Sequence, residues 1–159
     1  GAAGELGHIC LYPDGIDCNC GRRGCYEIYG SATALKNQTR EAMKKHPESK
    51  LWELSESPNE VTGKTAFDAM RLGDEAGKKV VDTYIEYIGI GATNIVNIFQ
   101  PEVISLGGGI SGEGQSLIDS LLPLVRAEQY GGGLVPLTDI RIAKLGNDAG
   151  IVGAAVLGL

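Results

Sequence analysis

Residues 4–8 read Gly-Glu-Leu-Gly-His, and residues 18–27 read Cys-Asn-Cys-Gly-Arg-Arg-Gly-Cys-Tyr-Glu. The second stretch holds all but one of the cysteines, and one of the two histidines lies just upstream of it. Structural zinc takes four nitrogen or sulfur ligands in a tetrahedron. We therefore predict a zinc site formed by His8, Cys18, Cys20 and Cys25, with a cluster of free thiols as the alternative. This set leaves no coordination position for water, so the metal is expected to be structural.

Two glycines and two carboxylates accompany these ligands. Gly21 and Gly24 fit the role of turn residues, because glycine makes sharp bends without a steric penalty from a Cβ atom. Glu5 and Glu27 bracket the metal ligands, and a compact fold would bring both carboxylates close to His8. A zinc-bound imidazole usually donates its other ring N–H to an acceptor. Such a group of acceptors and one donor suits a polyol; the alternative is that both glutamates are surface charges or supports for the metal.

The same residues resemble a family signature. Gly-Glu-Leu-Gly-His at 4–8, followed by Cys-x-Cys-Gly-x-x-Gly-Cys-x-Glu at 18–27, is similar to the pattern of the ROK family, which contains bacterial sugar kinases, glucokinases prominent among them, and sugar-responsive repressors. The resemblance implies that the histidine and the three cysteines bind zinc and that Glu5, His8 and Glu27 contact a hexose. It also implies phosphorylation of a hexose, glucose to glucose 6-phosphate, with ATP and Mg²⁺.

The resemblance extends into the second half of the chain. Residues 105–109 (Ser-Leu-Gly-Gly-Gly) and 146–150 (Gly-Asn-Asp-Ala-Gly) are similar to the family's C-terminal half. The implied fold class is α/β, the C-terminal lobe of an actin-like, ribonuclease-H-like ATPase fold with a zinc knuckle. Gly107, Gly108 and Gly109 would then lie by the nucleotide, near its adenosine end, although a tight glycine turn without ligand is at least as common. ROK proteins are commonly dimers or tetramers, so a homo-oligomer is expected.

Chain length predicts one domain over residues 1–159. The resemblance implies that this domain is the C-terminal lobe of a ROK sugar kinase in three segments: a zinc and sugar segment (1–30), a helical segment (31–99) and a nucleotide-side α/β segment (102–159). Apolar residues at spacings of three and four, with Phe99 the last of them, predict a long helix from about Asp74 that ends before Pro101. Further helices are expected at 31–45 capped by Ser31, at 51–54, at 65–72 capped by Thr65, at 116–126 with Leu124 on its buried side, and at 149–157 capped by Asn147-Asp148. Strands are expected at 8–11, at 102–106 with Val103 buried, and at 139–144. Strand, helix, strand, helix in the second half predicts a parallel sheet with crossover helices.

Composition limits the function classes. The net charge of −6 argues against binding to a phosphate backbone, so no nucleic-acid partner is expected for this domain. No apolar run approaches the length of a membrane helix, and no signal peptide is evident, so we expect a cytoplasmic protein without a membrane partner. Clustered cysteines beside a histidine favour metal over disulfides in a reducing compartment. Cys10 is left over, and we interpret it as a small apolar filler.

Three hypotheses remain open at this level: a lobe of a sugar kinase, the sugar-sensing effector domain of a ROK repressor, and a stand-alone zinc-binding module. The chain begins at Gly1 without methionine and reaches its main motif within a few residues, so we expect a piece of a longer protein. It contains no Asp-x-Gly-x-Thr phosphate loop and no Asn-Asp pair in the context of the family's catalytic base. We therefore assign no catalytic residue within this chain and expect the isolated chain to be inactive. The choice among hexoses is open.

Overall fold

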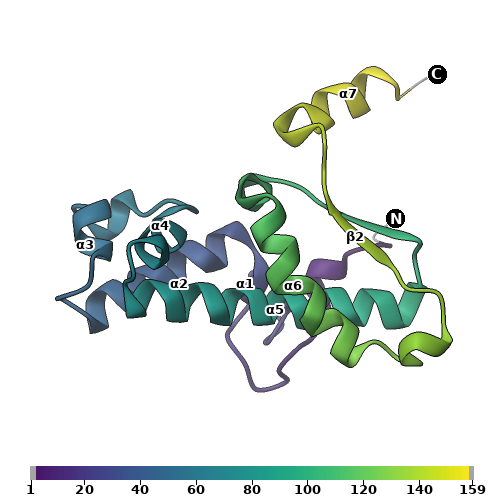
Figure 1. Ribbon diagram of the computed structural model, residues 1–159, viewed down its shortest axis with the longest axis horizontal. Coiled ribbons are helices and arrows are strands. Elements are labelled where there is room, and N and C mark those ends of the chain that lie inside the picture. The colour runs from purple at the N-terminus through teal and green to yellow at the C-terminus, as the bar shows by residue number, and fades with distance from the viewer. Residues whose placement is uncertain (1–2, 158–159) are drawn as a thin grey trace.

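Helix α5 (Glu75–Phe99) is the axis of the computed structural model, which describes residues 3–157 apart from the side chain of Asn147. Helices α1, α2, α4 and α6 pack along it (Figure 1). The helix begins because the Asp74 carboxylate accepts a hydrogen bond from the Gly77 N–H at 2.7 Å, and it ends at Gln100, which adopts a left-handed conformation just before Pro101. Both ends confirm the sequence prediction, but Phe99 is 60% exposed and does not belong to the buried stripe.

Short helices precede α5. They are the 3₁₀ turn η1 (Leu6–His8), α1 (Tyr26–Gly30), α2 (Ala32–Lys45), α3 (Leu51–Leu54), η2 (Pro58–Glu60) and α4 (Thr65–Arg71). Ser31 caps α2 as predicted, since its hydroxyl accepts from the Ala34 N–H at 3.1 Å. The cap predicted for Thr65 is wrong: Thr65 is the first residue of α4, and its hydroxyl accepts from the N–H of the preceding Thr62. The predicted strand at 8–11 is also wrong, because His8 ends a 3₁₀ turn and Cys10 forms a single bridge.

A two-stranded parallel sheet follows α5. Strands β1 (Val103–Leu106) and β2 (Asp139–Ile142) pair in parallel, with Ile104 opposite Ile140, and helix α6 (Gln115–Glu128) connects them. The parallel pair and its crossover helix confirm the sequence prediction. Val103, predicted to be buried, is 41% exposed, because β2 is the only partner of β1 in the described part of the chain. Two 3₁₀ turns lie in the connections, η3 (Gly109–Glu113) and η4 (Gly132–Leu134).

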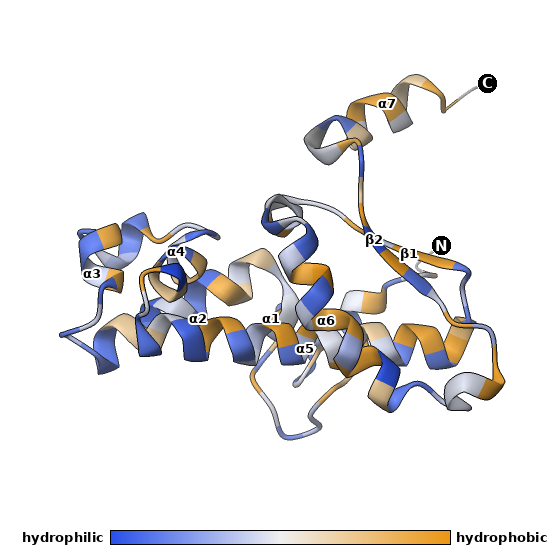
Figure 2. Ribbon diagram, viewed as in Figure 1, coloured by the Kyte–Doolittle hydropathy of each residue, from blue (hydrophilic) through white to orange (hydrophobic). Residues whose placement is uncertain are grey.

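The core lies between α5, α6, α4 and the sheet, and apolar residues concentrate there in Figure 2. Leu121 and Val125 of α6 are fully buried, whereas Leu124, predicted to be buried, is 39% exposed. A smaller cluster joins α2, α3 and α4 through Met43, Leu51, Val61 and Ala69. Among the described residues, no helix combines the length and apolar character needed to cross a bilayer.

Helix α7 (Ala149–Ala155), which follows the 3₁₀ turn η5 (Gly146–Asp148), stands apart from the other helices (Figure 1). Its larger apolar side chains are exposed: Ile151 is 72% and Val152 43% accessible. Asp148 occupies the N-cap position, but its side chain makes no capping hydrogen bond, so that part of the predicted cap is wrong. The other predicted member, Asn147, has a side chain outside the described part of the chain.

Candidate metal centre and sugar site

The segment from residue 5 to residue 27, here called the knuckle, brings the predicted zinc ligands together. One ligand atom from each of His8, Cys18, Cys20 and Cys25 lies within 4.8 Å of all the others. His8 Nδ1 is 3.7 Å from Cys18 Sγ, and Cys20 Sγ is 3.7 Å from Cys25 Sγ. Cys18 and Cys25 are buried, whereas Cys20 is exposed, so the cluster lies at the surface of the knuckle.

These separations fit a tetrahedral zinc ion. Zinc–sulfur bonds of about 2.3 Å and zinc–nitrogen bonds of about 2.0 Å place ligand atoms on tetrahedral edges of about 3.5–3.8 Å. Both short separations in the cluster, 3.7 Å each, fall in this interval. The donor set of three sulfurs and one imidazole nitrogen is also the chemistry that structural zinc prefers. The residues therefore fit the metal that the sequence predicts.

Tight backbone turns produce this arrangement. Gly21 and Gly24, predicted to be turn residues, have φ of +86° and +69°, in the left-handed region that favours glycine. At Gly24 a Cβ atom would lie 1.6 Å from the Tyr12 carbonyl oxygen, so only glycine fits there. The Cys18 N–H donates to the Arg22 carbonyl at 2.8 Å, which closes the loop that carries two of the sulfurs.

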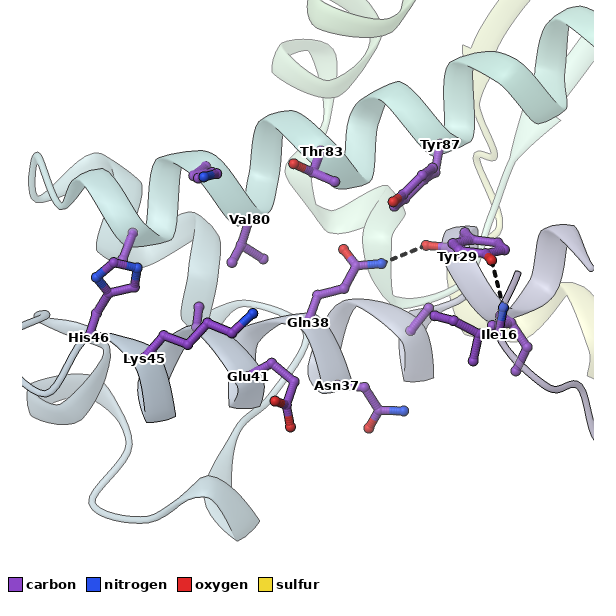
Figure 3. Close-up of a pocket in the computed structure, with 15 residues that line it drawn as sticks. Ile16, Tyr29, Asn37, Gln38, Glu41, Lys45, His46, Val80, Thr83 and Tyr87 are labelled. Atoms are coloured by element: carbon purple, nitrogen blue, oxygen red, sulfur yellow. Dashed lines mark hydrogen bonds between the residues drawn. The ribbon is translucent and has the colours of Figure 1, made fainter. Parts of the chain in front are cut away.

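Tyr29 of α1 fastens the knuckle to the helices. Its hydroxyl accepts from the Ile16 N–H at 2.9 Å, and its carbonyl accepts from Gln38 Nε2 of α2 at 2.9 Å (Figure 3). Its ring packs against those of Tyr12 and Tyr87, with centroids 5.1 and 4.9 Å away. The side chains drawn in Figure 3 line a cavity of about 470 Å³ between α2 and α5, to which no predicted ligand residue contributes. The sequence analysis missed Tyr29, because no local pattern reveals contacts with both the loop and α5.

His8 has two faces. Its Nδ1 points to the sulfurs, while its Nε2 lies 3.8 Å from Glu27 Oε2. That separation exceeds a direct hydrogen bond, and a third polar group beside the pair is able to hydrogen-bond to both atoms. Glu5 precedes η1, and its carbonyl accepts from the His8 N–H at 3.0 Å. Gly7, between them, packs against the Glu27 side chain, with a Cβ position only 3.4 Å from Glu27 Cβ.

The thiols of the cluster differ in acidity. Burial, followed by the neighbouring Cys20 and Cys18 sulfurs, raises the pKa of Cys25 to about 12. The pKa of Cys20 is lowered, chiefly because the Arg22 backbone donates a hydrogen bond to its sulfur. Zinc binds thiolates, so it must displace the Cys25 proton, and zinc affinity is expected to fall as the pH falls.

The glycine run lies in a different part of the molecule. Gly107, Gly108 and Gly109 follow the carboxyl end of β1 and are exposed, and Gly108 has φ of +76°. The α6 N-terminus does not follow them directly, because η3 intervenes. The carboxyl ends of parallel strands are the usual place for ligands in α/β folds. Their role in nucleotide binding remains a prediction.

Comparison with known proteins confirms the family resemblance seen in the sequence. The family model described as ROK matches residues 1–159. The chain belongs to the ROK family. Glucokinases from Thermotoga maritima and Halalkalibacterium halodurans are each 37% identical to it, over 98% and 99% of the chain but 49% and 48% of their own lengths. A xylose repressor of Caldicellulosiruptor bescii is 28% identical over 99% of the chain and 39% of its own length.

Solved ROK structures show the same fold. The crystal structure of a ROK family glucokinase from Streptomyces griseus in complex with glucose and AMPPNP superposes with a TM-score of 0.87 at 34% identity, covering 98% of this chain and 51% of that one. A ROK family transcriptional regulator superposes with a TM-score of 0.69 at 27% identity, covering 88% of this chain and 34% of that one. The chain spans about half the length of the glucokinases it matches. It therefore has a ROK glucokinase-like mixed fold of helices and strands.

Proposed function

We propose that this chain is the zinc-binding and hexose-binding half of an ATP-dependent sugar kinase that converts glucose to glucose 6-phosphate. The observation that carries the proposal is the orientation of the His8 ring. Its Nδ1 lies toward the three cysteines, and its Nε2 lies toward Glu27. The glucokinase relatives, and the one whose crystal contains glucose and AMPPNP, support this choice of reaction.

In this proposal the knuckle positions the sugar. A hexose hydroxyl that lies beside His8 Nε2 and Glu27 Oε2 accepts from the imidazole and donates to the carboxylate, which the 3.8 Å separation permits. Glu5 accepts from a further hydroxyl. Phosphoryl transfer depends mainly on positioning and charge neutralisation, so fixing the sugar lowers the barrier without a covalent step. Zinc, held by His8 and the three cysteines, supplies rigidity.

The other components belong to the intact protein in this proposal. ATP binds with Mg²⁺, and Gly107, Gly108 and Gly109 lie by its adenosine end. The catalytic base and the phosphate loop come from outside this chain. We further propose a cytoplasmic homo-oligomer. The isolated chain is expected to show no turnover in a coupled ATP–glucose assay, and turnover at ordinary enzyme rates would refute this division of roles.

The test of the sugar site is Glu27→Gln in the full-length protein. Losing a charged acceptor of a sugar hydroxyl is expected to lower kcat/KM for glucose about 10- to 100-fold while zinc content stays at one per chain. Asp17→Asn is the matched control, because Asp17 is an acid of the same knuckle that pairs with Arg23 at 2.8 Å. If the Glu27 variant retains full kcat/KM, or if the control loses as much, Glu27 does not bind the sugar.

A second candidate is the effector domain of a sugar-sensing repressor. It is favoured by the xylose repressor and the ROK transcriptional regulator among the relatives. Both candidates use the same knuckle, so the full-length protein must be assayed for both activities. Hexose phosphorylation supports the kinase, whereas sugar-dependent release from DNA without phosphorylation supports the repressor.

A further inference from the structure

Cys10 lies outside the metal cluster but directly opposite one of its ligands. Cys10 and Cys25 form an isolated antiparallel bridge. The flanking hydrogen bonds are Leu11 N–H to the Gly24 carbonyl at 2.7 Å and Tyr26 N–H to the Ile9 carbonyl at 2.8 Å. Since these bonds join the neighbours of the pair, Cys10 and Cys25 are a non-hydrogen-bonded pair. Side chains of such a pair point to the same face, and their Cα atoms are about 4.5 Å apart.

This geometry meets the requirement for a disulfide. Disulfides join residues whose Cα atoms are about 4.4–6.8 Å apart. Cys10 Sγ lies 3.7 Å from the Arg23 carbonyl oxygen, at the edge of the knuckle, and the residue is only half-buried. Pairing with Cys25 therefore needs side-chain rotation and no change of backbone register.

We propose that Cys10 is an oxidation site of the knuckle: a hydroperoxide oxidises Cys10, which then forms a disulfide with Cys25 and removes that ligand from zinc. The inference rests on the zinc site proposed above and goes beyond it. It assigns Cys10 a redox role in place of the apolar filler that the sequence suggests.

The chemistry uses one equivalent of peroxide for two thiols. Breakage of the O–O bond transfers one oxygen to the Cys10 sulfur, giving a sulfenic acid and one water or alcohol. The Cys25 thiolate then attacks this sulfur, so that the S–S bond forms and the S–O bond breaks. The hydroxide that leaves takes a proton and becomes water. The two sulfurs lose two electrons, and the peroxide gains them.

Oxidation of Cys25 removes one of the four proposed zinc ligands. Only His8, Cys18 and Cys20 remain, and a closed structural site needs four ligands. Release of the ion frees His8, whose Nε2 faces Glu27, so oxidation of Cys10 disrupts the proposed sugar site as well. Exchange with an external dithiol restores both thiols and allows zinc to rebind.

The test treats the zinc-loaded protein with a small excess of hydrogen peroxide and follows zinc with a chromogenic chelator. Digestion with trypsin and an aspartate-directed protease places Cys10 in a peptide separate from the other cysteines, because cleavage at Asp14, Asp17 and Arg23 separates them. The expected result is release of zinc together with a cross-linked pair of Cys10 and Cys25 peptides. A disulfide between Cys20 and Cys25 as the main product, which their 3.7 Å separation also permits, would overturn the proposal.

Two variants sharpen the test. Cys10→Ser, outside the metal cluster, is expected to bind the same amount of zinc and to release it at least about fivefold more slowly under peroxide. Adding Ile9→Cys to Cys10→Ser moves the thiol to the neighbouring position, whose side chain points to the opposite face. This double variant is expected to remain slow, and fast release by either variant would overturn the proposal. Absence of zinc before oxidation would instead refute the metal site itself.

Discussion

The knuckle and the helical core are built on different principles. Between residues 5 and 27 the buried apolar side chains are Cys18 and Cys25, which belong to the proposed metal cluster. The core of α4, α5 and α6 instead buries large side chains such as Tyr84 and Leu121. With zinc bound as proposed, the stability of the knuckle depends on an ion, whereas the stability of the core depends on apolar burial. A substitution that unfolds the knuckle should therefore leave the helical core folded, and a substitution that weakens the core should leave the metal site intact.

The largest effect is expected from Cys25→Ser. Structural zinc contributes about 10–16 kcal/mol in small zinc domains, so loss of one ligand should remove the ion and the order of the knuckle. Zinc content is expected to fall from one per chain to near zero. Hydrogen exchange should show amide protection lost by more than about 100-fold in residues 5–27 and retained in α5. An equal loss of amide protection in α5 would contradict the contrast between the two regions, because it would mean that the core also depends on the metal.

An intermediate effect is expected from Leu121→Ala. Leu121 is fully buried between α6 and α5, so the cavity should lower the free energy of unfolding by about 2–5 kcal/mol. Zinc content below the unfolding transition should stay at one per chain. Leu124→Ala is the matched control on the same helix, and its loss should be smaller, since Leu124 is 39% exposed. Urea unfolding measures both, and equal losses would contradict the assigned buried face.

The smallest effect is expected from Asp74→Ala. The Asp74 carboxylate accepts from the N–H groups of Gly77 and Lys50 and from the Ser49 hydroxyl at 2.7–3.0 Å, so removing it should cost about 1–2 kcal/mol. Burial alone would raise the pKa of Asp74, but these donors outweigh it, and the pKa lies below its ordinary 3.8. A depressed pKa stabilises the fold above the unfolded value, and the contribution is lost as pH falls through the folded value. The difference between wild type and variant should thus shrink below pH 3.8, and a difference that grows in acid would contradict this assignment.

Sequence reasoning succeeded where structure is local. The cap at Ser31, the start of α5 near Asp74 and the turns at Gly21 and Gly24 depend on near neighbours, so the sequence indicates them. The short spacing of Cys18, Cys20 and Cys25 likewise indicates that their side chains lie close together, because a short loop limits the distance between them.

Apart from the wrong caps at Thr65 and Asp148, the errors concern contacts between distant segments. Spacing alone gave no sign that Leu124 and Phe99 face solvent, because the neighbours of a helix decide which part of an apolar stripe is covered. The strand expected at 8–11 is replaced by a turn and one bridge, since Cys10 pairs with a residue beyond the metal loop. The role of Tyr29 as the anchor between knuckle and helices depends on the same kind of distant contact.

The central claim is that one zinc ion is held by His8, Cys18, Cys20 and Cys25. Metal analysis combined with X-ray absorption spectroscopy on the purified protein tests it most directly. The account predicts one zinc per chain, with three sulfur neighbours at about 2.3 Å and one nitrogen at about 2.0 Å. Protein that carries no zinc, or zinc bound by oxygen and nitrogen alone, would contradict it.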